Sequence, residues 1–445
     1  MRKQLELITV ANDLASRINQ FSVESLLVRI LEERKSGNPE AVATTDDYNN
    51  LLEGWLRSKC GVGSAERCEQ IVLEMEDRFK QGDNTIQPDL QSFKTVLMAW
   101  KFSNAKFAAV RAQRVLEWMI RLAVDGENPS VLPDADCFDI VLQQWSRSGA
   151  KDAPEKTEKL LIAMERLYKA TGSEAVKPRT SSFNAALAAW CRSNDKGGLQ
   201  RAIDILGFME ARAKAGDSFG VPDEASYTTV VSALLKTPSP QSARKAEVFL
   251  RSAEKVTTPM SPDTILYNTC IGCWARSNKS GAYRKARSIL DRQIDLYEQG
   301  NIKTKPDVYG FTSVIASCAM EPGSKKERTK AFHVALAAYQ QLSKYDQPNH
   351  VTYGTMLKAC ARLLPDNDHL RHKWAKKIFR HSVADGCVGD MVVSRMREAV
   401  SPPIYRDLMK GNKKQSLPFS WRKNVREKSE YRRKSDTKNP RAAEV

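Results

Sequence analysis

The sequence predicts an all-α fold, built as a solenoid of helix-turn-helix repeats. An aromatic residue returns every 40 to 45 residues, and apolar residues are spaced around it as on one face of an α-helix. A proline lies between successive helical patterns and separates two helices, because it lacks the amide donor. The recurring aromatic residues are Tyr48, Phe93, Phe138, Phe183, Tyr227, Tyr267, Phe311 and Tyr353.

Length and composition are compatible with such a fold and exclude others. The chain has 445 residues, of which 41% are hydrophobic, so it can bury a large core. Lys and Arg number 70 against 53 Asp and Glu, a net charge of +17. No apolar stretch approaches the roughly 18 to 20 residues of a membrane-spanning helix, and acidic residues in the first 40 positions are atypical of a targeting peptide. We therefore expect a soluble protein with no transit peptide visible in this chain.

The first helix of each repeat begins just before the recurring aromatic. Apolar or small residues follow that aromatic three, four and seven positions on, as in Phe93, Val96, Leu97 and Trp100. These positions share one face of a helix. Such a stripe is usually core, so we assign no chemistry to the tryptophans.

A second helix is predicted 19 to 22 residues after each aromatic. It opens with a residue that is usually Ala and continues at helical spacing, as in Ala112, Val115, Leu116 and Met119. The small opening residue allows the two helices of a hairpin to approach closely. A hairpin this short cannot bury its apolar face alone, so neighbouring hairpins must stack.

A proline followed by a capping residue marks each boundary between repeats. An Asp or Asn comes directly after the proline in every case except Arg179, and these residue types start helices well. The boundary prolines are Pro88, Pro133, Pro178, Pro222, Pro262, Pro306 and Pro348.

We expect three parts along the chain. Residues 1–43 form N-terminal helices that cap the array, residues 44–395 form eight repeats, and residues 396–445 form a capping segment and a basic, disordered tail. From Lys410 onward the tail holds 12 Lys or Arg against 4 Asp or Glu, which adds sequence-independent affinity for nucleic acid. An apolar island in the tail should dock on the last repeat and consists of Leu417, Pro418, Phe419 and Trp421.

The repeat boundaries resemble the pentatricopeptide repeat. The run from Ser261 to Thr269 reads Ser-Pro-Asp-Thr-Ile-Leu-Tyr-Asn-Thr and is followed by an Ala286-x-x-Ile289-Leu290 helix. Over about residues 44 to 395 the chain is similar to pentatricopeptide repeat proteins, with repeats lengthened in the turn and mainly after the second helix. The resemblance implies a right-handed superhelix that binds single-stranded RNA, one base per repeat.

In this family, a base is read by the residue after the first-helix aromatic, together with the residue that closes the repeat. Three pairs fall outside the family's rule: Lys94 with Asp134, Asp139 with Arg179, and Gly354 with Asp390. The pairs that fit it imply the site 5′-UnnUGUAn-3′, although Asn and Thr near a helix start can also be simple capping or solvated residues. The fitting pairs are Asn49 with Asp89 (uracil), Asn184 with Asp223 (uracil), Thr228 with Asp263 (guanine), Asn268 with Asp307 (uracil) and Thr312 with Asn349 (adenine).

The family also places an aliphatic residue two positions before the aromatic, where it sandwiches the base. Ile265 and Val351 fit this role, and Tyr309 offers a ring for stacking. Repeats 6 to 8 should therefore read RNA better than repeats 1 to 3. The positions that do not fit are Asp46, Gln91, Asp136, Ser181 and Ala225.

Basic residues near the ends of the first helices are candidate phosphate contacts. Stacked at one position per repeat, they would form a stripe along the phosphate backbone. The alternative is favourable charge at a helix C-terminus, and the sequence does not separate the two. These residues are Arg57, Arg147, Arg192, Arg276 and Arg362.

No pattern predicts catalysis, so we expect no enzyme, no cofactor and no metal. Cys270 and Cys273 form a single C-x-x-C within a predicted helix, which favours core packing over zinc. His369 and His372 lie one turn apart, without fitting partner ligands. The nine cysteines are scattered, which favours a reduced compartment.

Two function classes remain. The first is a monomeric adaptor that binds single-stranded RNA, acts on mitochondrial or plastid transcripts in processing, stability or translation, and meets other RNA-processing proteins but no membrane. The second is a tetratricopeptide-like scaffold for protein partners, since helical hairpin solenoids also present grooves to peptides. The polar residue after each aromatic and the Pro-Asp boundaries favour RNA.

Overall fold

The computed structural model describes residues 43–58, 61–255, 262–366, 368–409 and 417–425, together with Ser36. These residues contain α-helices and three short 3-10 helices and no strand, which confirms the all-α prediction. The expected N-terminal helices over residues 1–43 lie almost wholly outside the described residues, as does most of the tail. No helix in the described part of the chain is long and apolar enough to cross a membrane.

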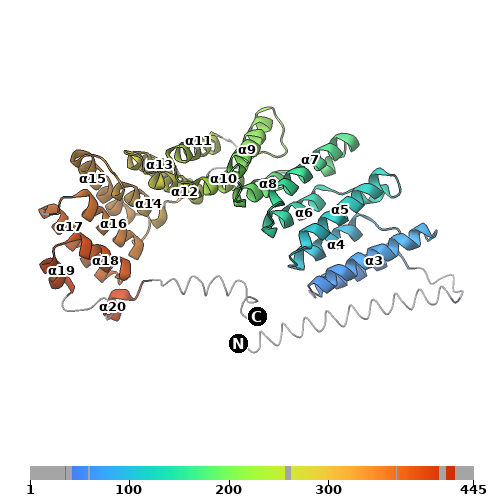
Figure 1. Cartoon of the computed structure of the whole chain (residues 1–445), viewed down its shortest axis with the longest axis horizontal. Coiled ribbons are helices and arrows are strands. Elements are labelled where there is room, and N and C mark those ends of the chain that lie inside the picture. The colour runs from blue at the N-terminus through green and yellow to red at the C-terminus, as the bar shows by residue number, and fades with distance from the viewer. Residues whose placement is uncertain are drawn as a thin grey trace. The chain divides into compact units, whose positions relative to one another are not determined.

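The chain divides into two compact units, with the boundary between Pro222 and Asp223. Each unit holds four of the eight predicted hairpins (Figure 1). The helices of unit 1 are α2 (Thr45–Arg57), α3 (Val62–Lys80), α4 (Leu90–Phe102), α5 (Ala108–Val124), α6 (Ala135–Ser148), α7 (Ala153–Thr171), α8 (Thr180–Arg192) and α9 (Gly198–Lys214).

Unit 2 continues the same alternation and ends in three further helices. Its hairpins are α10 (Glu224–Lys236) with α11 (Pro240–Lys255), α12 (Thr264–Arg276) with α13 (Ala282–Glu298), α14 (Val308–Ala319) with α15 (Lys325–Leu342), and α16 (His350–Leu363) with α17 (His369–Ala384). They are followed by α18 (Asp390–Ala399), α19 (Pro402–Met409) and α20 (Phe419–Arg422).

The first helices of successive hairpins stack on one another within each unit. In unit 1, α4 contacts α2 and α6, and α6 contacts α8; in unit 2 the contacts run from α10 through α12, α14 and α16 to α18. Figure 1 shows these helices as one layer of each unit and the second helices as the other. Residues at the same position of successive first helices therefore lie side by side.

The predicted stripes form the core. Each of the eight recurring aromatics is at most 2% exposed, and burial of such a side chain stabilises the fold by roughly 1.5 to 3 kcal/mol. The small residues that open the predicted second stripes, such as Ala112 and Ala246, are fully buried, as the close approach of two helices requires. They lie at least one turn inside α5 and α11, which begin at Ala108 and Pro240. Trp100, Trp145 and Trp274 are nearly buried and serve packing.

The linkers after the second helices are longer than the turns within the hairpins: ten residues separate α5 from α6, whereas five separate α4 from α5. Three of these linkers contain a 3-10 helix: η1 (Pro129–Val131), η2 (Glu174–Val176) and η3 (Ile302–Thr304). A threonine at the start of a first helix fastens the linker that ends its own repeat. The Oγ1 atoms of Thr45, Thr180 and Thr264 donate to the carbonyls of Gln87, Val221 and Lys305 at 2.7 to 2.8 Å.

The apolar island of the tail docks on the last hairpin. Helix α20 contacts α17, with the rings of Trp421 and Phe379 5.9 Å apart in an edge-to-face arrangement. The Val388 amide donates to the Trp421 carbonyl at 2.7 Å. Phe419, by contrast, is 86% exposed.

Candidate nucleic-acid interface

The Asp or Asn that closes most repeats caps the next first helix, whereas the side chain of Arg179 does not cap α8. Asp89, Asp263 and Asp307 accept from backbone amides three residues on, at 2.8 to 3.1 Å. This is the capping role that Asp and Asn favour at a helix start. Four of the predicted reading pairs are in direct contact: Asn49 with Asp89, Lys94 with Asp134, Asp139 with Arg179, and Asn268 with Asp307.

In unit 1 the first predicted pair is closed by internal hydrogen bonds. The Nδ2 atom of Asn49 donates to both carboxylate oxygens of Asp89 at 3.3 Å. Its Oδ1 atom accepts from the hydroxyl of Ser92 at 2.7 Å. Both ends of the Asn49 amide are therefore occupied by residues of the next repeat.

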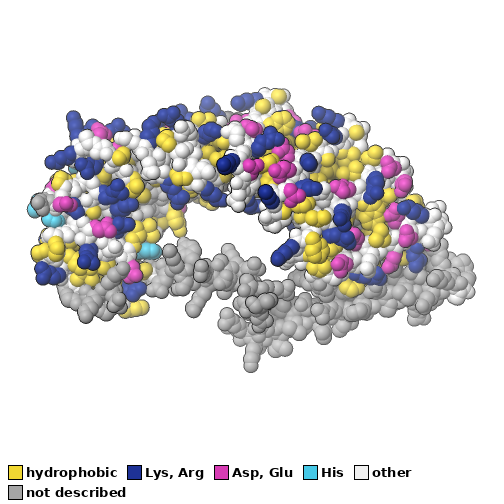
Figure 2. Space-filling model, in the orientation of Figure 1, with side chains coloured by type: hydrophobic (Ala, Val, Ile, Leu, Met, Phe, Trp, Pro, Cys, Tyr) yellow, Lys and Arg dark blue, Asp and Glu magenta, His cyan; other side chains and the backbone are white. Residues whose placement is uncertain are grey.

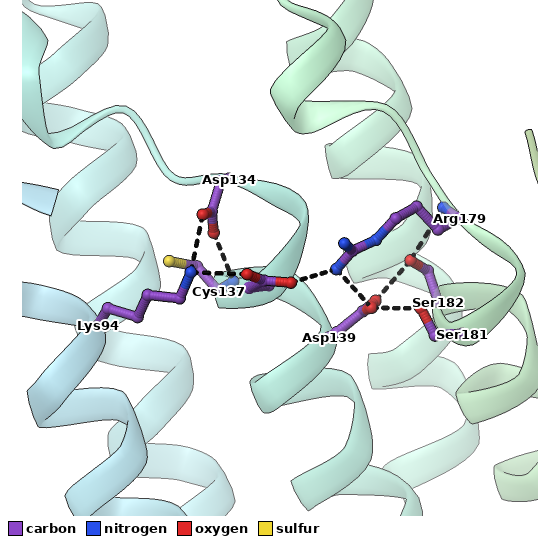
Figure 3. A network of polar contacts seen from close by, with 8 residues as sticks. Lys94, Asp134, Cys137, Asp139, Arg179, Ser181 and Ser182 are labelled. Atoms are coloured by element: carbon purple, nitrogen blue, oxygen red, sulfur yellow. Dashed lines mark hydrogen bonds and ion pairs between the residues drawn. The ribbon is translucent and has the colours of Figure 1, made fainter. Parts of the chain in front are cut away.

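The second and third pairs of unit 1 merge into one ionic network (Figure 3). Lys94 in α4 lies 2.9 Å from Asp134 and 2.7 Å from Asp136, at the start of α6. Arg179 at the start of α8 lies 2.5 Å from Asp136 and 3.1 Å from Asp139. The network joins three consecutive first helices.

Asp139 is the most buried member of this network, at 6% exposure. The hydroxyl of Ser182 donates to its Oδ1 at 2.5 Å, and the hydroxyl of Ser181 donates to its Oδ2. Hydrogen bonds from Lys94 and Arg179 lower the pKa of Asp136, so it stays charged. Three carboxylates against two cations leave this surface with a negative excess, which opposes a phosphate backbone.

The fourth pair divides between the units. Asn184 lies in α8 of unit 1. Asp223 opens unit 2, where it caps α10 and accepts from the Ser226 amide at 2.8 Å.

In unit 2 the predicted reading residue Thr228 has fewer hydrogen bonds than its counterpart Asn49 in unit 1. Its Oγ1 atom is buried and has no hydrogen-bond partner among the described residues. The closing residue, Asp263, caps α12 and shares a hydrogen bond with Glu224. That bond, burial and the charge of Asp263 raise the pKa of Glu224 to about 7. Glu224 therefore keeps its proton to a higher pH than an ordinary glutamate does.

The Asn268 side chain is only partly satisfied by hydrogen bonds. Its Nδ2 donates to Asp307 Oδ1 at 2.9 Å, whereas its Oδ1 has no partner within the described chain. Gly310 lies against that oxygen, since a Cβ added there would come within 2.6 Å of it. A buried acceptor without a donor costs roughly 1 to 3 kcal/mol. The imino N–H of uracil is a donor of the required type.

In the last two pairs the predicted reading residue is occupied by the next repeat, through a hydrogen bond at Thr312 and through packing at Gly354. Thr312 Oγ1 is hydrogen bonded to Thr352 Oγ1 at 2.8 Å, and Asn349 caps α16. Gly354 is covered by the next helix, because a Cβ there would meet Met391 at 2.8 Å. No base can reach Gly354, which agrees with its place outside the family's rule.

The residue immediately before the aromatic was not singled out from the sequence. Its side chain influences whether the predicted reading residue of the preceding repeat has a hydrogen-bond partner. Where it is Ser or Thr, as in Ser92, Ser182 and Thr352, its hydroxyl bonds to the predicted reading residue of the preceding repeat. Where it is Leu266 or Gly310, the preceding Thr228 or Asn268 keeps an unpartnered oxygen. The signal was visible in the sequence, directly beside the aromatic.

Unit 2 contains a groove of about 810 Å³ that brings the predicted reading and sandwich residues together. Asn268 and Asp307 line it beside Ile265 and Tyr309. Both of these side chains are 60% exposed, although they are large and apolar. Val351, the third predicted sandwich residue, is 38% exposed. Exposed apolar side chains beside fixed polar groups suit a planar ligand that stacks and forms hydrogen bonds.

Cations gather at the same groove. Arg276, Lys358 and Arg395 line it, and Lys358 Nζ and Arg362 Nη1 lie 3.5 and 3.3 Å from the same sulfur, that of Met320. Burial, with the charges of Arg395 and Arg362, lowers the pKa of Lys358. Lys358, Arg362 and Arg395 lie close enough to repel one another, and such a cluster favours an anionic ligand such as phosphate.

The other predicted phosphate contacts lie in unit 1 and differ from one another. Arg57 pairs with Glu53 at 2.7 Å. Arg192 donates to the carbonyl of Ser146 at 2.9 Å, which joins it to the preceding first helix. Arg147 is exposed.

The cysteines of the C-x-x-C are packing residues. Cys270 and Cys273 are buried, and each thiol donates to a backbone carbonyl. Burial raises the pKa of Cys273 to about 12 and that of Cys270 as well, so both stay protonated, whereas metal binding needs the thiolate. Among the described residues, no group of three or more His, Cys, Asp or Glu is placed to hold a metal.

The chain is similar in structure to pentatricopeptide repeat proteins. One similar structure is the pentatricopeptide repeat protein PPR10 in complex with an 18-nt psaJ RNA element, with 17% identity, a TM-score of 0.33, and coverage of 89% of this chain and 57% of that chain. Another is PPR10 from maize, with 15% identity, a TM-score of 0.29, and coverage of 93% and 64%. This chain thus aligns with less than two thirds of the length of those proteins. No family model and no curated protein matches it.

Proposed function

We propose that this chain is a pentatricopeptide-like protein that binds single-stranded RNA through the groove of unit 2 and has no catalytic activity of its own. The observation that carries the proposal is the meeting of Asn268, Asp307, Ile265 and Tyr309 in one groove with three cations on its wall. Apolar side chains can stack on a base, the polar pair can meet its edge, and the cations can hold phosphates.

The bases proposed for unit 2 are guanine at Thr228, uracil at Asn268 and adenine at Thr312. Guanine and uracil both carry an imino N–H on the Watson-Crick edge, and the unpartnered oxygens of Thr228 and Asn268 are acceptors. Adenine has no imino donor there, and the hydroxyl of Thr312 can donate as well as accept. The full proposed site remains UnnUGUAn, with GUA as the part assigned to unit 2.

A binding experiment tests the proposal directly. RNA that contains UnnUGUA should bind the full chain at least about tenfold more tightly than a scrambled sequence, because one mismatched base costs about 1 to 3 kcal/mol. Thr228→Asn should shift the preference at the fifth base from guanine toward uracil. Equal affinity for target and scramble, together with no shift in the variant, would refute base reading and favour the tetratricopeptide-like scaffold.

The cellular role proposed with this activity is that of an adaptor on mitochondrial or plastid transcripts. A protein that covers a short single-stranded site can protect it, expose a neighbouring site or assist translation without a reaction of its own. A fluorescent fusion of the full-length protein, co-stained for both organelles, tests the compartment. Crosslinking and sequencing of bound RNA in the same cells identifies the transcript.

A further inference from the structure

Helix α17 carries a row of basic side chains on one face. Lys373, Lys376, Lys377 and Arg380 recur at the three- and four-residue spacing of a helical face. His369, His372 and His381 continue the same face at both ends. We call these seven residues the α17 stripe. The opposite face of α17 is buried, so the fold holds the stripe at the surface.

The α17 stripe lines a hollow of about 550 Å³, to which α19 contributes Ile404. No acidic side chain of the described chain lines this hollow. Within the described residues none of the seven forms an ion pair, in contrast to the many paired cations elsewhere. Figure 2 shows histidines (cyan) beside Lys and Arg at the edge of unit 2 where α17 lies.

Two of these side chains are held in place by aromatic neighbours rather than by carboxylates. Lys377 Nζ lies 5.1 Å from the centre of the Trp374 ring. His381 Nδ1 lies 3.0 Å from the hydroxyl of Tyr339, and the two rings are stacked. The positive charge of the stripe is therefore oriented but not neutralised.

The α17 stripe is separate from the groove of unit 2. The residues that line the hollow and those that line the groove have no member in common. From His369 to His381 the stripe runs about 18 Å along the helix, at about 1.5 Å per residue. The four Lys and Arg along this length can neutralise up to about four phosphates of a single strand.

We propose that the α17 stripe is a second RNA-contact site, which binds the phosphate backbone of RNA that extends beyond the bases read in the groove. Cations in a line, with no acid among them, match a polymer with regularly spaced negative charge. The contact is made to phosphates and carries no base preference. The inference rests on the proposed function only in that RNA is the ligand.

The test compares two variants of the full chain from which the same number of charges is removed. The stripe variant combines Lys373→Gln, Lys376→Gln, Lys377→Gln and Arg380→Gln. The control variant combines Lys325→Gln, Lys326→Gln, Arg328→Gln and Lys330→Gln in the neighbouring helix α15, where all four residues are also exposed. Long-range electrostatics change alike in both, so a difference between them reports local contact.

Each variant is titrated with two RNAs over a range of salt: the eight-nucleotide target alone, and the same target within about 24 nucleotides of polycytidine. The stripe variant should bind the long RNA at least about tenfold less tightly, and its log-log salt slope should be shallower by roughly 2 to 3, at about 0.7 per phosphate lost. Its affinity for the short RNA, and its preference for target over scramble, should change less than about twofold. The control variant should differ little between the two RNAs.

Three outcomes would overturn the site: equal losses in the two variants, equal losses for the two RNAs, or a stripe variant that loses affinity for a polyglutamate peptide while its affinity for the long RNA is unchanged. A stripe effect that persists while target and scramble bind equally would instead overturn base reading alone. Circular dichroism checks folding. Should the fourfold variant not fold, Lys373→Gln and Arg380→Gln are measured singly, with an expected slope change of about 0.7 each.

Discussion

Units 1 and 2 repeat the same helical hairpin, but they use the position after the aromatic differently. In unit 1, Asn49, Lys94 and Asp139 are bound by side chains of the next repeat, and the ionic network of Figure 3 joins three first helices. In unit 2, Thr228 and Asn268 keep unpartnered oxygens. The position proposed to read a base in unit 2 therefore binds side chains of the next repeat in unit 1.

The two units also differ in net charge, and unit 2 is the more basic. Residues 43–222 hold 24 Lys or Arg against 25 Asp or Glu, a net charge of −1, whereas residues 223–409 hold 28 against 18, a net charge of +10. Acidic side chains are interspersed with basic ones over the visible face of unit 1 (Figure 2). Since phosphate contacts dominate affinity for nucleic acid, unit 2 is the half suited to hold RNA.

Charge reversal in the groove should have the largest effect. Arg276→Glu combined with Lys358→Glu should lower the affinity for UnnUGUA RNA roughly 100-fold at moderate salt, because two phosphate contacts become repulsive. The same reversal at Lys101 and Arg147 of unit 1 should cost less than about fivefold. Fluorescence anisotropy with labelled RNA measures both. Equal losses would mean that the two units contribute alike.

Loss of Arg179 should affect stability rather than binding. Arg179→Ala leaves Asp139 buried with only hydroxyl partners, and we expect unit 1 to lose about 2 kcal/mol, somewhat below the usual cost of breaking a buried pair. Arg201→Ala, which breaks an exposed pair with Glu158, should cost less than about 1 kcal/mol. Urea denaturation followed by circular dichroism distinguishes these values. RNA affinity that falls with stability would contradict the structural role of the network.

A substitution at the residue before the aromatic should turn a pair with an unpartnered oxygen, such as that of Asn268, into one bound by a hydroxyl of the next repeat, such as that of Asn49. Gly310→Ser would bring a Cβ within 2.6 Å of Asn268 Oδ1, so the amide must shift, and the new hydroxyl would compete for that oxygen as Ser92 does for Asn49. The variant should weaken binding of UnnUGUA RNA roughly tenfold. Gly207→Ser, at a helical glycine with open space around it, should leave binding unchanged. Competition titrations with RNAs that vary only the sixth base show whether the loss is specific to uracil.

The smallest expected effect is a dependence of the stability of unit 2 on pH. The pKa of Glu224 rises from 4.5 to about 7 in the folded protein. Between these values the folded state holds a proton that the unfolded state has lost, so stability falls as pH rises through this window and levels off above it. Glu224→Gln should flatten the thermal midpoint between pH 5 and 7.5 and raise it by about 2 to 4 °C at pH 7.5, the shift for about 1 kcal/mol. Glu66→Gln, at an exposed site in unit 1, should do neither.

Much of the candidate site could be predicted from the sequence, because its parts recur. The aromatic and its helical stripe give the first helices, and the Pro-Asp pairs give their starts. The resemblance to the pentatricopeptide repeat then implies the partners Asn49 with Asp89 and Asn268 with Asp307. The resemblance does not say whether a pair is free. That depends on the side chain that the next repeat places against it, as Ser92 and Gly310 show, and on charges that meet only across stacked helices.

By itself the sequence determined the all-α hairpin array, the buried aromatics and the approximate helix boundaries, because helix periodicity, capping and proline are local properties of the chain. The tertiary structure alone decided that Lys94 and Arg179 pair with the carboxylates of Asp134, Asp136 and Asp139, that Gly354 lies beneath Met391, and that Lys358 lies near Arg395. These relations join residues about 40 positions apart. They arise only when one hairpin packs on the next, and hydrogen bonds, burial and charge act over that contact rather than along the chain.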